Sequence, residues 1–125
     1  MTKTQRFDVQ DRPPVNRWGE GRVTLLGDAA HPMTPNMSQG ACQAIEDAVV
    51  LGRYLKESAD IPQALRAYEE RRMPRTAHIA RIAWRLGWAV SFENPVVVAL
   101  RTLAMRATFN TVILRAEERD VGYDF

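Results

Sequence analysis

The stretch 22–42 sets the strongest limit on how this 125-residue chain can fold. Residues 22–26 are apolar and β-branched and lead directly into Gly27 and Asp28, which predicts a buried strand that ends at a tight turn. A loop rich in proline follows, and a helical spacing of apolar residues begins near Gly40. Asp28 therefore stands at the carboxyl end of a predicted strand, where open α/β sheets bind their ligands.

A second strand is expected at residues 7–10, where apolar and polar residues alternate before two consecutive prolines. Two short strands make only a marginal sheet in water, and residues 22–26 are apolar enough to be covered on both faces. We therefore expect a fragment of a larger α/β fold. In this fragment one or two short strands precede three or four helices, and most residues are helical.

Helical periodicity covers most of the chain after Gly40. A first amphipathic helix is predicted to end near Lys56. A second begins at Asp60, an N-cap residue, and is expected to kink or end at Pro74 and to resume over 75–90. A last helix begins at Asn94-Pro95 and extends over 96–114. The apolar face predicted for the first helix comprises Ala41, Ala44, Ile45, Ala48, Val49, Leu51 and Leu55.

Composition excludes several classes of function. The chain has 17 basic and 15 acidic side chains, and the net charge of +2 is too small for a nucleic-acid-binding surface. Cys42 is the only cysteine, which rules out an intrachain disulfide and a multi-cysteine metal site, and we expect no bound metal. Arg85, Arg101 and Arg106 interrupt the later apolar runs. We expect a cytoplasmic protein without a membrane span.

The predicted helix start offers a binding site for an anion or for the polar edge of a ring. The main-chain N–H groups of Gly40, Ala41 and Cys42 have no acceptor within the helix, and the helix dipole places about half a positive charge there. Asp28 can accept hydrogen bonds from sugar-like hydroxyls. Taken singly, Asp28 also fits a simple turn former and Gly40 a loop glycine.

The whole pattern closely resembles the second FAD motif of flavoprotein aromatic hydroxylases. The resemblance extends upstream to residues 11–14 and 18–23 and downstream to residues 68–75. The matching core reads Gly27-Asp28-Ala29-Ala30-His31-Pro32, then Pro35, then Gln39-Gly40 followed by Ala41-Cys42-Gln43-Ala44-Ile45-Glu46-Asp47-Ala48.

The resemblance implies a cofactor, a reaction and roles for the site residues. FAD is the implied cofactor, with Asp28 on the ribityl chain, Pro32 and Pro35 beside the isoalloxazine ring, and amides near Gly40, Ala41 and Cys42 at its pyrimidine edge. The implied reaction uses NADH or NADPH and dioxygen to hydroxylate or epoxidise a small aromatic or apolar substrate. Because the flavin carries the chemistry, no catalytic side chain is expected.

The sequence departs from the family pattern in two ways. No G-x-G-x-x-G turn is present among the seven glycines, so the ADP half of FAD has no visible site. Ser38 replaces the usual first glycine of the Pro-x-x-Gly-Gln-Gly loop, and a side chain there strains the backbone if φ is positive.

These departures lead us to expect one incomplete FAD-binding domain that is inactive alone. Residues 1–26 are assigned to the edge of a substrate domain and the return into the FAD domain. Residues 27–57 form the flavin-contacting loop and helix, and residues 58–125 the helical C-terminal region. A complementing N-terminal segment is one expected partner. The alternative is an inactive fragment that acts as a helical association module, with itself or with a related flavoprotein.

Overall fold

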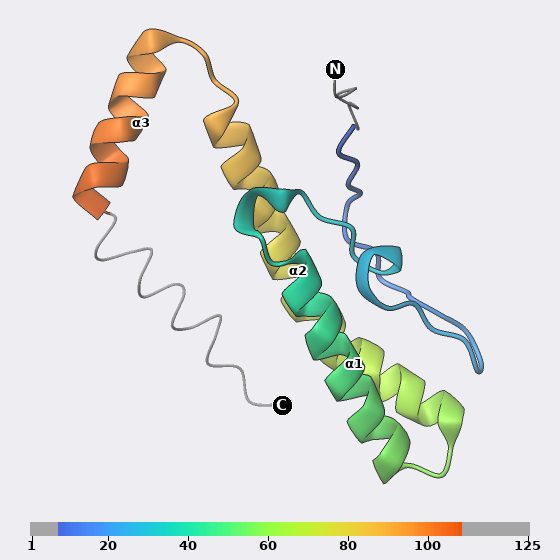
Figure 1. The fold of residues 1–125 in the computed structure, drawn as a ribbon. Coiled ribbons are helices and arrows are strands. Elements are labelled where there is room, and N and C mark those ends of the chain that lie inside the picture. Colours follow the sequence, from blue (N-terminus) through green and yellow to red (C-terminus); the bar gives the residue numbers. More distant parts are fainter. Residues whose placement is uncertain (1–7, 109–125) are drawn as a thin grey trace, which may run out of the picture. The chain divides into compact units, whose positions relative to one another are not determined.

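The computed structural model describes residues 8–108, and helices dominate them (Figure 1). Helix α1 spans Gly40–Glu57, α2 spans Ile61–Val90 and α3 spans Pro95–Thr108. Two short 3₁₀ turns precede α1, η1 at Gly27–Ala29 and η2 at Pro35–Met37. The chain divides into two compact units, residues 1–87 and 88–125.

The strand predicted at 22–26 is wrong, and residues 8–108 contain no strand. A single antiparallel bridge instead joins Glu20 and Val23, whose main chains exchange two hydrogen bonds of 3.0 Å. Two main-chain carbonyls of this segment bind side chains of α2 instead of a neighbouring strand. Arg66 donates to Val23 O at 3.1 Å, and the Tyr68 hydroxyl donates to Leu25 O at 3.3 Å. Residues 8–10 are likewise not a strand, and residue 7 lies outside the described range.

The predicted starts of all three helices are confirmed. α1 begins at Gly40, and Asp60 caps α2 by accepting a hydrogen bond of 3.3 Å from the Gln63 amide. Asn94 Oδ1 accepts the Val96 amide at 2.9 Å and so caps α3. Residues 109–114, the predicted end of the last helix, lie outside the described residues.

Helix α2 continues through Pro74 to Val90. Of the two predicted outcomes, an end at this proline is therefore wrong, and a kink there stays a prediction. Proline removes one main-chain donor and disturbs the preceding turn. Arg72 and Arg75 stand on either side of it, and both bind Glu46 of α1 at 2.7 Å. These ion pairs hold the two sides of the proline against the same neighbouring helix.

The predicted apolar face of α1 is not its buried face. Ile45 and Val49 are 66% and 49% exposed, whereas Gln43, Asp47 and Val50 are buried. The reason is that α1 packs on α2 through a polar network rather than through aliphatic contacts. The apolar core of this unit lies beside that network and comprises Trp18, Ala30, Val50 and Tyr68.

The second unit contains the end of α2, a short loop and α3. Trp88 and Phe92 pack edge to face with ring centroids 4.6 Å apart. Arg101 of α3 donates to the carbonyls of Ala89 and Val90, each at 3.1 Å, and so holds α3 to the end of α2. Within residues 8–108 no helix has both the length and the apolar character needed to cross a membrane.

Candidate functional site

The predicted site residues all lie in the segment that runs from η1 through η2 to the first turn of α1. Asp28 is the exposed central residue of η1, and Pro35 is the first residue of η2. Gly40, Ala41 and Cys42 form the first turn of α1, and Cys42 is an exposed free thiol.

The structure brings Asp28 and Gly40 together. A Cβ atom at Gly40 would lie 4.0 Å from Asp28 Oδ1 and 4.0 Å from the Met33 side chain. The first main-chain hydrogen bond of α1 runs from the Gln43 amide to Gln39 O at 2.9 Å. The amides of the three preceding residues therefore point out of the helix, next to an exposed carboxylate.

Ser38 has a positive φ, which is the condition under which its side chain is expected to strain the backbone. Its φ is 53° and its ψ is 24°, and it is the one non-glycine residue with positive φ in the described part of the chain. It ends η2, where its amide donates to Pro35 O at 2.9 Å. The residue that joins η2 to α1 is therefore in the left-handed conformation, which glycine would adopt without strain.

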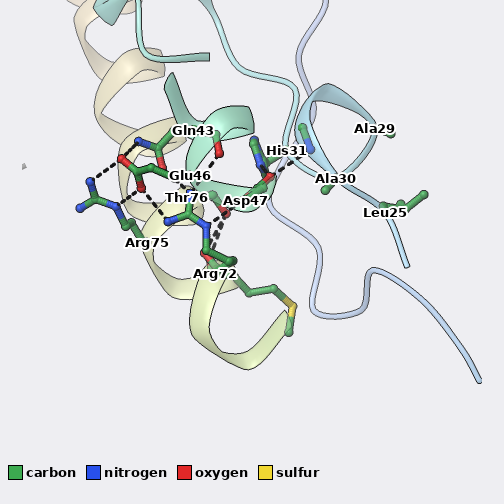
Figure 2. A network of polar contacts seen from close by, with 12 residues as sticks. Leu25, Ala29, Ala30, His31, Gln43, Glu46, Asp47, Arg72, Arg75 and Thr76 are labelled. Atoms are coloured by element: carbon green, nitrogen blue, oxygen red, sulfur yellow. Dashed lines mark hydrogen bonds and ion pairs between the residues drawn. The ribbon is translucent and has the colours of Figure 1, made fainter. Parts of the chain in front are cut away.

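The buried carboxylate of Asp47 holds the turn that carries Asp28. Asp47 Oδ2 accepts the Gly27 amide at 3.0 Å. It also accepts His31 Nε2–H at 2.6 Å (Figure 2). The main chain closes the same turn, since the amides of Ala30 and His31 donate to Gly27 O at 2.8 and 2.9 Å. Asp47 thus binds the turn at both of its ends.

Arg72 of α2 binds the other side of this carboxylate. Its Nε donates to Asp47 Oδ1 at 2.7 Å, one Nη donates to Glu46 at 2.7 Å, and the other Nη donates to the Gln43 side chain at 2.8 Å. Arg72 and Asp47 are fully buried. Buried charges are tolerated only when paired and hydrogen-bonded, as they are here (Figure 2).

The network shifts the titration of its members. Burial alone raises the pKa of Asp47, but the hydrogen bonds from His31, Arg72 and Gly27 outweigh it, and the pKa lies below the usual aspartate value. In the same way, bonds from the arginines outweigh burial and lower the pKa of Glu46. Burial, aided by the charge of Asp47, raises the pKa of Tyr68.

Sequence reasoning did not select Asp47, His31 or Arg72 as site residues. One signal was present, because Gln43, Asp47 and Val50 recur at helical spacing and their stripe differs from the apolar one. The partner of that stripe, Arg72, lies on another helix, so spacing within one helix does not reveal it. Residues 8–108 contain no cluster of three or more side chains suited to a metal ion.

Comparisons with known proteins identify the family. The family model described as FAD binding domain matches residues 1–83. The chain belongs to this family, that of FAD-dependent monooxygenases of the hydroxylase type. Aurachin C monooxygenase/isomerase of Stigmatella aurantiaca is 48% identical over 101 residues, which cover 81% of this chain and 26% of that protein. The 3-hydroxybenzoate 6-hydroxylase of Klebsiella oxytoca is 50% identical over 84 residues, 66% of this chain and 20% of that enzyme.

A solved structure shows the same local fold. A variant of Klebsiella pneumoniae HpxO complexed with FAD matches with a TM-score of 0.84 and 32% identity, over 94% of this chain and 31% of that one. The chain thus spans about a quarter of the length of these proteins. FAD is the cofactor of the family.

The residues between η1 and α1 fit a flavin in four respects. Asp28 offers acceptors for hydroxyl groups, and the amides that open α1 offer donors for ring oxygens and nitrogens. Gly40 leaves open the space that a side chain would fill beside Asp28. The buried Thr34 hydroxyl has no hydrogen-bond partner within residues 8–108 and lies in the same loop.

Proposed function

We propose that residues 27–42 form the flavin-ring part of the FAD site of a monooxygenase. The reaction uses NADH or NADPH and dioxygen to hydroxylate or epoxidise a small aromatic or apolar substrate. The observation that carries the proposal is the placement of Asp28 beside the glycine that opens α1. The named hydroxylase relative supports an aromatic substrate.

Each residue has a simple task in this proposal. Asp28 accepts hydrogen bonds from ribityl hydroxyls, and the amides of Gly40, Ala41 and Cys42 meet the pyrimidine edge of the ring. That edge becomes negative when flavin is reduced, and a helix N-terminus stabilises negative charge. Pro35 shapes the loop beside the ring. The flavin, when bound, supplies the redox and oxygen chemistry.

The remaining FAD contacts would come from parts of the relatives' sequences that this chain does not cover. We propose that residues 1–26 belong to the edge of a substrate domain and the return into the FAD domain, that residues 27–57 contact flavin, and that residues 58–125 are the helical C-terminal region of the same domain. The chain alone is then inactive, and a complementing N-terminal segment completes the FAD site.

FAD titration of the purified chain tests this proposal, alone and with the upstream segment of an FAD-binding relative added in trans. Flavin absorbance and fluorescence report binding. We expect saturable binding that Asp28→Asn weakens, whereas the matched exposed aspartate variant Asp8→Asn leaves it unchanged. Absence of saturable binding in both formats, or equal binding by the wild-type chain and Asp28→Asn, would contradict the proposal.

A second candidate function is association through α3. Within its own unit α3 exposes a row of apolar side chains, with Val96, Leu100 and Leu103 between 63% and 66% exposed. Exposed apolar surface of this kind favours contact with another protein or a second copy. Sedimentation analysis of the wild-type chain and of Leu100→Gln distinguishes this role, since only association through α3 responds to the variant.

A further inference from the structure

We propose that Asp47 is a positioning residue for the flavin site. It would set the distance between the Asp28 carboxylate and the amides that open α1, although it contacts no flavin itself. The inference rests on the proposed function of residues 27–42. It adds to that site the fully buried Asp47.

The hydrogen bonds of one carboxylate oxygen carry the argument. Asp47 Oδ2 receives Gly27 N–H and His31 Nε2–H, which lie immediately before and just after the segment that contains Asp28. Gly27 has φ +60°, and a Cβ atom there would lie 3.3 Å from Ala44 Cβ of α1. The turn is therefore pressed against α1 where only glycine fits well, and its orientation depends on Asp47.

Asp47 and the helix N-terminus are parts of one rigid element. Asp47 follows Gly40 by about two helical turns, so the donors that open α1 and the acceptor that holds the Asp28 turn move together. The spacing between Asp28 and these donors is consequently fixed by a single helix rather than by residues 32–39, which connect η1 to α1. A binding site needs this kind of support to hold its geometry.

One further contact keeps the Asp47 carboxylate from turning. Arg72 Nε donates to the opposite oxygen at 2.7 Å, and Arg72 itself is held by Glu46 and Gln43. His31 depends on Asp47 in turn, because its Nδ1 is buried and has no partner within the described residues. Trp18 packs against the imidazole ring at a centroid distance of 5.4 Å. Loss of Asp47 would leave both ring nitrogens without a hydrogen bond.

Asp47→Asn and Glu46→Gln form a matched pair of variants that separates positioning from general stability. Each removes one carboxylate from Arg72, and only Asp47 touches the turn. We expect Asp47→Asn to weaken FAD binding roughly ten- to hundredfold, the range for a lost hydrogen bond to a charged group. Glu46→Gln should change it less than about threefold. Equal losses in the two variants would overturn the proposal.

Amide hydrogen exchange gives a readout that does not need FAD. We expect the Gly27 amide to exchange faster in Asp47→Asn and to keep its protection in Glu46→Gln. Unchanged Gly27 protection in Asp47→Asn would refute the positioning role even in a chain that binds no flavin. A wild-type chain that binds no FAD, with Gly27 released only in Asp47→Asn, would contradict the proposed function and leave the turn-holding role supported.

His31→Ala serves if Asp47→Asn does not fold. It leaves the ion pair between Asp47 and Arg72 intact and removes only the hydrogen bond from the His31 side chain to Asp47. We expect a several-fold weaker FAD affinity with the Gly27 amide still protected. An FAD affinity equal to that of the wild-type chain would count against the proposal.

Discussion

Replacement of Ser38 by glycine should stabilise the chain, although most substitutions in a folded protein destabilise it. Ser38 has φ 53° and is exposed, and its hydroxyl makes no hydrogen bond within residues 8–108. A left-handed residue other than glycine costs about 1–2 kcal/mol. Glycine also gives the unfolded chain more freedom, which costs roughly 0.4–1 kcal/mol. The difference predicts a gain of about 0.5–1 kcal/mol for Ser38→Gly.

Denaturation of the purified chain in urea measures this gain as a higher midpoint at an unchanged slope. Ser58→Gly is the matched control, because Ser58 ends α1 with φ −119° and its hydroxyl contacts Asp60. Glycine there relieves no strain, and we expect a loss of about 1 kcal/mol. If Ser38→Gly unfolds at the same or a lower urea concentration than the wild-type chain, the account of strain at Ser38 is incorrect.

Three further predictions concern charges and caps. The lowered pKa values of Asp47 and Glu46 mean that the folded chain binds fewer protons than the unfolded one, so stability is present above pH 4–5 and falls as the pH drops through the folded pKa values; urea titrations at pH 7 and pH 3 measure the difference. Arg72→Met should cost about 3–5 kcal/mol, because it removes the cation paired with the buried Asp47 and leaves that carboxylate with His31 and the Gly27 amide, whereas the exposed Arg53→Met should leave the urea midpoint unchanged. Asn94→Ala should cost about 1 kcal/mol, seen as faster amide exchange at Val96.

The sequence predicted those features that depend on neighbouring residues along the chain. Asp60 and Asn94 cap their helices because a side-chain oxygen and an amide two or three residues later are sufficient for the contact. The sequence indicated strain at Ser38 only on the condition that its φ is positive, and the structure gives a φ of 53°. The flavin roles of Asp28 and Gly40 are still predictions.

Features that depend on distant residues were predicted incorrectly or not at all. Residues 22–26 have strand composition, but a strand needs a partner, and Arg66 and Tyr68 of α2 bind their carbonyls instead. The buried face of α1 was assigned to its aliphatic stripe. It is set by Arg72, which is 25 residues beyond Asp47 along the chain.

The buried network determines how α1 packs on α2 more than it adds to stability. Replacing a buried ion pair by apolar side chains of similar volume often leaves the free energy of unfolding unchanged or increases it. A charged pair, however, permits few alternatives, since any shift that separated Arg72 from Asp47 would remove the main ion pair of two fully buried charges. The register of the two helices therefore fixes Asp47, and Asp47 fixes the turn at Gly27 and His31. A core contact distant from the exposed loop thus governs where Asp28 stands relative to the start of α1.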